Sequence, residues 1–214
     1  MPAEQGGPMF IGAQVSLYPM TGDFVPVIMD ALTAFDPYRE KLRIETDDIS
    51  TLIVGAPEVV FPALRDFYVA AAATRHHVVL RVTLSRGCPG EPDDPMCATG
   101  ALANPDTPVA QRIEEARAAV RDAAQTGEEA AAQFSLYVMG EGQHMDEIYG
   151  CIDFLKGSGT FDRSKNFCTR ITGDAGPVFA TLREGFCRFG APEGHVTMDL
   201  TVSANSPSTC KAAA

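Results

Sequence analysis

Polar and apolar positions alternate along several short segments in the first third of the chain, and each alternation predicts a β-strand. Strands of this kind are expected at residues 13–19, 41–46 and 77–84, and the short run at 50–54, which follows the turn signal Asp47-Asp48, predicts one more. Between them, apolar residues recur at helical spacing over 23–35 and over 57–72. Pro57 suits the start of the second helix, whereas Pro62 would delay or kink it. The predicted order of elements is therefore βαββαβ.

The same pattern returns almost 120 residues later. The segment 14–20, QVSLYPM, recurs as QFSLYVM at 133–139, and 77–85 recurs as 195–203. Matching residues are 119 apart in the first pair of segments and 118 apart in the second, which one deletion in a loop explains. A repeated βαββαβ unit predicts an α+β chain with two tandem ferredoxin-like repeats, each with an antiparallel sheet and both helices on one face.

We therefore divide the chain into a first ferredoxin-like repeat at 10–90, a linker at 91–130 and a second repeat at 131–208. The linker begins with residues rich in glycine, proline and aspartate, which favour an irregular connection. Good helix formers then follow a proline, so a helix is expected over 108–124. We interpret it as a connecting helix on the surface.

The alternation also divides the strand residues between two sheet faces. Val15, Leu17 and the other strand residues that point to the same side are expected under the helices. The face without helices is predicted to carry Gln14, Ser16, Tyr18, Thr51, Ile53, His77, Val79, Arg81 and Thr83, and in the second repeat Gln133, Ser135, Tyr137, Thr169, Ile171, His195, Thr197, Asp199 and Thr201. This face could contact water, pack against another sheet or bind a small polar ligand.

Some of these side chains suit a flat heterocyclic ligand. Tyr18 and Tyr137 could stack on an aromatic ring, and the hydroxyls of Thr51 and Thr169 could hydrogen-bond to it. Near the first set lie two acidic residues, Asp47 and Asp48, which would favour a cation. Their aligned partners in the second repeat are Lys165 and Asn166, so the acidic contribution is lost there.

Composition excludes several other functions. The chain has 17 basic and 28 acidic residues, a net charge of −11, which argues against nucleic-acid binding. It has no apolar run of the roughly 18 residues that a membrane span needs, and no signal peptide is apparent, so we expect a cytoplasmic protein. The six cysteines form no Cys-x-x-Cys pair, which favours reduced, buried or incidental thiols over a zinc site.

The sequence also lacks the motifs of common enzymes. It has no P-loop, no Gly-x-Ser-x-Gly motif and no Rossmann glycine pattern, and no pair of carboxylates recurs in both repeats. The residues that do recur are suited to binding, so we expect a protein that is not an enzyme and needs no cofactor or metal. Two alternatives stay open: a ferredoxin-like enzyme that uses His77 or His195, and an ACT-like regulatory module that senses an amino acid.

Five ordered motifs resemble the YkoF family of thiamin- and hydroxymethylpyrimidine-binding proteins. They are SLYPMT at 16–21, TDDIST at 46–51, GCPG at 87–90, QFSLY at 133–137 and LTVSANSPS at 200–208. The resemblance implies two ACT-like repeats, a homodimer, a role in thiamin uptake with a transporter as partner, and one thiamin site per repeat. The sites would lie near Leu17 and Thr51 and near Leu136 and Thr169, with the leucines acting through the main chain. Val138 departs from the family pattern, which usually has proline at that position.

Overall fold

The computed structural model describes residues 10–87, 107–139, 145–190 and 195–208, and it contains the predicted βαββαβ order twice. The elements of the first half are β1 (Ile11–Pro19), α1 (Phe24–Leu32), the 3-10 helix η1 (Thr33–Tyr38), β2 (Arg43–Thr46), β3 (Thr51–Gly55), α2 (Pro57–Ala72) and β4 (Val78–Arg86). After α3 (Val109–Arg121), the second half consists of β5 (Glu129–Met139), α4 (Met145–Lys156), β6 (Phe161–Ser164), β7 (Thr169–Asp174), α5 (Ala175–Arg188) and β8 (His195–Ala204).

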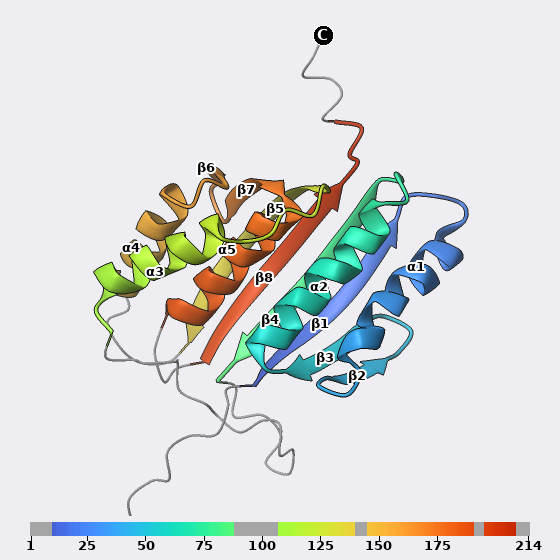
Figure 1. Ribbon diagram of the computed structural model, residues 1–214, viewed down its shortest axis with the longest axis horizontal. Coiled ribbons are helices and arrows are strands. Elements are labelled where there is room, and N and C mark those ends of the chain that lie inside the picture. The colour runs from blue at the N-terminus through green and yellow to red at the C-terminus, as the bar shows by residue number, and fades with distance from the viewer. Residues whose placement is uncertain (1–9, 88–106, 140–144, 191–194, 209–214) are drawn as a thin grey trace, which may run out of the picture.

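The two halves share one antiparallel sheet of eight strands in the order β2-β3-β1-β4-β8-β5-β7-β6 (Figure 1). The strands β4 and β8 pair along their whole length, with Val82 opposite Leu200. These two residues occupy the same position in the two repeats, so a pseudo-twofold axis passes between them. Each repeat therefore pairs the strand edge that it would expose alone, which removes an aggregation-prone edge from both.

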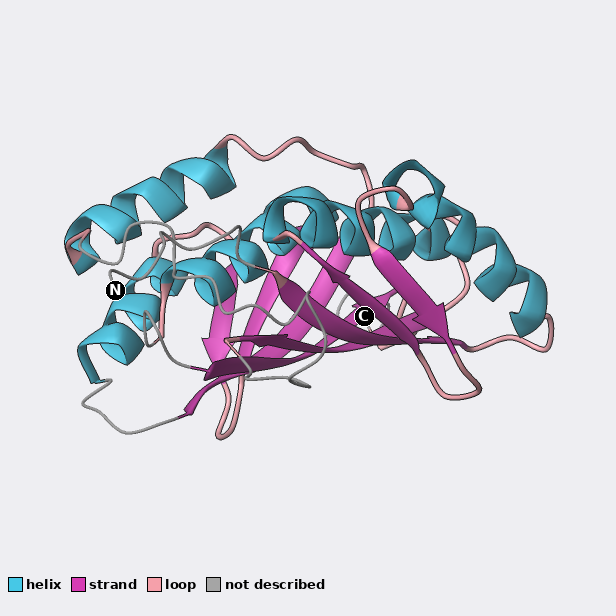
Figure 2. Cartoon of the chain, turned by 90° about the horizontal axis from the view of Figure 1, so that it is seen from below, coloured by secondary structure: helices cyan, strands magenta, loops and turns pink. Residues whose placement is uncertain are grey.

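The helices cover one face of this sheet and leave the other bare (Figure 2). Val15, Leu17 and the apolar residues of β4 lie under the helices and are buried, as predicted. The predicted connecting helix is present as α3, but it packs against α4 and α5. Its residues Ile113, Ala116 and Val120 are buried, so it completes the helical layer rather than lying on the surface alone.

Two helical predictions need correction. The first helix was expected over 23–35, but the α-helix ends at Leu32 and the chain continues as a 3-10 helix through Tyr38. The second helix is continuous from Pro57 to Ala72, so Pro62 does not delay it. Pro62 removes only one helical N–H, and burial of most of the helix offsets that loss.

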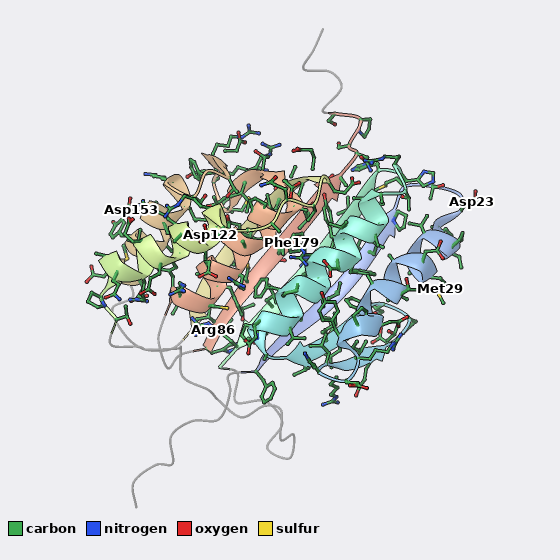
Figure 3. All side chains as sticks on the ribbon, in the orientation of Figure 1. Asp23, Met29, Arg86, Asp122, Asp153 and Phe179 are labelled. Carbon is green, nitrogen blue, oxygen red and sulfur yellow. The ribbon has the colours of Figure 1, made fainter. Side chains whose placement is uncertain are left out.

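The halves also cap each other's helices. Arg86, at the end of β4, donates from Nε to Phe186 O (2.9 Å) and from Nη2 to Phe189 O (2.8 Å), at the end of α5. Figure 3 shows Arg86 at this junction. In the opposite direction, Asn205 Nδ2 donates to Ala72 O at 2.8 Å, at the end of α2. Carbonyls at a helix C-terminus lack partners within the helix, so each repeat satisfies the helix end of the other.

Candidate functional site

In each half of the sheet, one strand extends beyond the end of its neighbour, and this leaves a notch. In the second half, the β5–β7 ladder ends at the pair Phe134 and Thr169, whereas β5 continues to Met139. In the first half, the β1–β3 ladder ends at the pair Val15 and Thr51. We call the gap beside Leu17 and Thr51 the first notch, and the gap beside Leu136 and Thr169 the second notch.

The hydrogen-bond alternation of the sheet directs the main chain of Leu136 into the second notch. Lys165 N donates to Cys168 O at 2.8 Å, so the polar main-chain groups of Cys168 point toward β6. The N–H and C=O of the next residue, Thr169, therefore point toward β5. Phe134 is paired with Thr169, and its N–H and C=O point toward β7. Leu136 has the same parity as Phe134, but it lies beyond the end of β7. Its N–H and C=O therefore both face the notch.

The first notch has the same geometry. Met20 N donates to His77 O at 2.8 Å, which continues the β1–β4 ladder and assigns the even-numbered residues of β1 to β4. The odd-numbered residue Leu17 therefore directs its N–H and C=O to the other side, past the start of β3. The expectation that both leucines offer main-chain groups agrees with this alternation.

Matching hydrogen bonds hold the turn beside each notch. Ser135 Oγ donates to Phe167 O at 2.6 Å, and Ser16 Oγ donates to Ile49 O at 3.1 Å. The turns close alike, since Asp47 N donates to Ser50 O at 3.0 Å just as Lys165 N does to Cys168 O. The two turns thus have a common framework although their sequences differ.

A cavity of about 440 Å³ adjoins the second notch. It lies between β5, α4 and the β6–β7 turn, and Leu136, Tyr137 and Thr169 are among the residues that line it. Apolar side chains of Phe134, Ile148, Cys151, Ile152 and Leu155 contribute much of the remaining wall. An apolar cavity of this size with a few convergent polar groups is typical of sites for small organic ligands.

The predicted face of Thr51 and Ile53 is wrong. Thr51 is only 7% exposed and pairs with Val15, while Ile53 is fully buried and pairs with Ala13, so both lie under the helices. Thr169 and Ile171 likewise pair with residues of the covered face. Directly paired residues of antiparallel strands share a face. The short run from 50 to 54 does not alternate in polarity, so it did not reveal its parity.

This correction separates two groups of candidate residues. Leu17 and Thr51 lie together on the helix-covered side, and so do Leu136 and Thr169. The side chains of Tyr18 and Tyr137 lie on the bare face and are 50% and 51% exposed. The sheet therefore separates the tyrosine rings from the threonine hydroxyls, although Tyr137 is among the residues that line the cavity.

The family is decided by the match of both halves. A family model described as "YKOF-related Family" matches residues 10–91 and 129–209. The chain belongs to the YkoF family. A protein of Bacillus subtilis (strain 168) with the name "Putative HMP/thiamine-binding protein YkoF" is 37% identical over 198 residues, which covers 92% of this chain and 91% of the relative. The predicted resemblance is thereby confirmed, and the matched segments coincide with the two βαββαβ halves.

The imidazoles of His77 and His195 in this YkoF-family chain lie on the bare face of the sheet. His77 Nε2 is 3.1 Å from Ser203 Oγ, and His195 Nε2 is 2.8 Å from Ser85 Oγ, both on the bare face of the central β4–β8 pair. Each histidine thus contacts a serine of the other repeat. These hydrogen bonds place the two imidazoles across the sheet from Thr51 and Thr169.

Two of the cysteines that the structure describes, Cys151 and Cys168, line the cavity. Burial, with a smaller effect of Glu147, raises the pKa of the Cys151 thiol to about 12, so this cysteine in the cavity wall is protonated near neutral pH. Cys88, Cys97 and Cys210 lie outside the described residues. Within the described ranges, no group of three or more His, Cys, Asp or Glu side chains could hold a metal ion. No helix in those ranges is both long and apolar enough to span a membrane.

Sequence reasoning missed the contribution of α4 and of the turn. Ile148 and Ile152 line the cavity although they are 41% and 38% exposed, and Phe167 at the turn is 90% exposed. A signal for them was present, because the apolar stripe of this helix is wider than core packing requires and because a phenylalanine lies in an otherwise polar turn.

Proposed function

We propose that each repeat binds the pyrimidine ring of thiamin or of free hydroxymethylpyrimidine in its notch, without chemical conversion, in thiamin uptake or salvage. One observation carries the proposal: the N–H and C=O of Leu136 face the same notch, beside the Thr169 hydroxyl and an apolar cavity of about 440 Å³. The name of the Bacillus subtilis relative supports the same ligand class.

The chemistry of the ring fits these groups. An aminopyrimidine presents an amino donor next to a ring-nitrogen acceptor, and one strand residue presents a C=O acceptor next to an N–H donor. The two edges can therefore pair as two strands do, with each hydrogen bond contributing about 0.5–1.5 kcal/mol. The Thr169 hydroxyl can add a third bond, and the side chains of Phe134 and Ile152 would cover the ring. Leu17 and Thr51 offer the same groups in the first notch.

The two alternatives receive less support from the geometry. An enzyme that used His77 or His195 would need its substrate on the bare face, because both imidazoles lie there. An amino-acid site needs a partner for a carboxylate and another for an ammonium group. In the wall of the second cavity, Glu147 is already paired with Arg112, which leaves Lys165 as its remaining ionic group.

Calorimetry tests the proposed function directly. We expect thiamin and hydroxymethylpyrimidine each to bind with two sites per chain and to raise the melting temperature, since a ligand that binds only the folded state stabilises it. Amino acids should give no heat of binding and should not raise the melting temperature. A single site per chain would contradict equivalent use of the repeats. Breakdown of the ligand during long incubation, lost on His77→Ala or His195→Ala, would favour the enzyme instead.

Removing the first threonine hydroxyl should weaken one site only. Thr51 Oγ1 lies 3.0 Å from Thr46 Oγ1, so this hydroxyl has one hydrogen-bond partner in the protein. Thr51→Val keeps the side-chain shape and should weaken thiamin binding at the first site by about 1–2 kcal/mol, because the ligand loses a hydrogen bond in a partly desolvated site. Thr169→Val is the matched control and should affect the second site alone. Unchanged calorimetry for Thr51→Val would remove Thr51 from the site.

Homodimer formation, a transporter partner and a cytoplasmic location stay predictions. We place the second copy of a dimer on the bare sheet face, where Tyr18 and Tyr137 are half exposed. The charges at its centre are already paired, since Arg81 contacts Asp199 across the β4–β8 seam. Such a face can be covered without leaving an unpaired charge.

A further inference from the structure

The hairpins that border the two notches carry opposite charge. The β2–β3 hairpin, residues 43–55, has one arginine and three carboxylates, for a net charge of −2. The β6–β7 hairpin, residues 161–173, has three basic residues and one carboxylate, for a net charge of +2. Corresponding strands at the two ends of one sheet therefore surround similar notches with fields of opposite sign.

The turns of the two hairpins have similar backbone structure although their charges are opposite. Both turns are closed by the same main-chain hydrogen bond, and both are held by a serine hydroxyl of the neighbouring strand. Asp47 and Lys165 occupy the same position in these turns, as do Asp48 and Asn166. The β6–β7 ladder has a register shift between Phe161 and Arg163 that the β2–β3 ladder lacks. At the turns themselves, the difference therefore lies in side chains on a common framework, which suits two sites that differ in ligand preference.

The charges at the turns are not cancelled locally. Lys165 lines the second cavity, and its Nζ donates to the neutral amide of Gln133 at 2.8 Å. The other ionic group in that wall, Glu147, is paired with Arg112. In the first hairpin, the backbone N–H groups of Ile49 and Ser50 donate to Asp47 Oδ1, each at 2.8 Å. These bonds hold the pKa of Asp47 below its usual value, so it stays ionised near neutral pH.

We propose that the hairpin charges assign different vitamers to the two notches: the first notch prefers cationic thiamin, and the second prefers pyrimidines without the cation, either neutral hydroxymethylpyrimidine or phosphorylated forms. The inference rests on the proposed function and deepens it. Thiamin carries a fixed positive charge on its thiazolium ring, whereas hydroxymethylpyrimidine is neutral and the phosphates are anionic. Both notches offer the same contacts to the pyrimidine ring. The rest of the ligand would lie near the hairpin beside the notch, and the charge of that hairpin is what differs between the two repeats.

Site-specific tryptophans can separate the two notches. The chain has no tryptophan, and Ile49 and Phe167 occupy matching exposed positions at the two turns (76% and 90% exposed). Ile49→Trp and Phe167→Trp, made one at a time, each give a single reporter. Titration with thiamin, hydroxymethylpyrimidine and thiamin monophosphate then yields the preference of each notch, and calorimetry on the same variants supplies a second measurement.

We expect thiamin to be favoured over hydroxymethylpyrimidine by about three- to ten-fold more in the first notch than in the second at low salt, because several charges act across about a Debye length. The difference should shrink in 0.5 M salt. Asp47→Lys with Asp48→Asn in the first turn, and Lys165→Asp with Asn166→Asp in the second, should exchange the preferences. Asp47→Asn with Asp48→Asn keeps amide oxygens for the turn and should give an intermediate preference, which guards against a folding defect.

The control is Asp122→Asn, which removes one negative charge after the end of α3, in the helical layer. It should leave both preferences unchanged. Equal preferences in the two notches, or preferences that do not respond to the exchanged turns, would overturn this inference and leave the proposed function intact. If neither vitamer binds by fluorescence or calorimetry, the proposed function itself fails.

Discussion

Replacing Leu136 with proline will weaken pyrimidine binding in the second repeat by at least about ten-fold while the sheet stays intact. The Leu136 N–H points into the notch, so the proline removes no sheet hydrogen bond. It removes the donor that we assign to the ring nitrogen and places its own ring at the edge where the ligand would pair. Pro19 is a natural precedent, since it has the same parity as Leu17 and ends β1 without interrupting the β1–β4 ladder.

The matched control is proline at the next position. Tyr137 faces Thr197, and its N–H points toward β8, so Tyr137→Pro removes a hydrogen bond from the middle of the sheet. This variant should be destabilised by about 3 kcal/mol or more. Circular dichroism and thermal melts distinguish the two variants, and calorimetry measures the sites. Normal second-site binding by a folded Leu136→Pro variant would contradict the assignment of the main chain.

Replacing Arg86 with methionine will lower the free energy of unfolding by about 3 kcal/mol. Arg86 is 3% exposed, donates to the carbonyls of Phe186 and Phe189, and lies with its guanidinium carbon 5.7 Å from the centre of the Phe186 ring. Burial lowers its pKa to about 10, so the guanidinium is still charged at neutral pH. Methionine fills much of the volume, yet it leaves two helix-end carbonyls without their donor.

Denaturant unfolding measures this loss, and the melting temperature should fall by about 6–12 °C for a chain of this length. Arg65→Met is the control, because Arg65 lies on a helix surface and pairs with its neighbour Asp66. The two side chains are 32% and 36% exposed, and a pair this close to solvent contributes about 1 kcal/mol or less. Equal effects of the two substitutions would show that Arg86 has no special part in joining the halves.

Local periodicity accounts for the elements that were predicted well. Strands and helices with a regular apolar pattern, such as β1, β4 and α2, lie where the pattern placed them. The errors occur where a local pattern was short or mixed. The segment 50–54 has apolar residues on both faces, so only its pairing with β1 reveals that Thr51 lies under the helices. The helix expected over 23–35 tightens into a 3-10 turn that includes Pro37, at which an α-helical hydrogen bond is not available.

The candidate site was predictable in part. The recurrence of Leu17 and Thr51 as Leu136 and Thr169, together with the family resemblance, pointed to the strands that border the two notches. The exposed side chains of α4 and Phe167 each had a local signal, but they were not identified as parts of one site, because their cavity forms between elements that are distant in the sequence. Tyr18 and Tyr137 were expected beside the threonine hydroxyls, but the pairing of Thr51 and Thr169 puts the two kinds of side chain on opposite faces of the sheet.

The sequence by itself determined that the chain is a doubled βαββαβ unit, that its helices cover one face, and that its family is that of YkoF. Duplication and alternation are local properties, and they survive in the order of residues. Only the tertiary structure decided that β4 and β8 join the repeats into one sheet, that Arg86 and Asn205 cap helices of the opposite repeat, and that each notch opens under the helices. These features depend on the register between distant strands, which is set by the packing of both halves together.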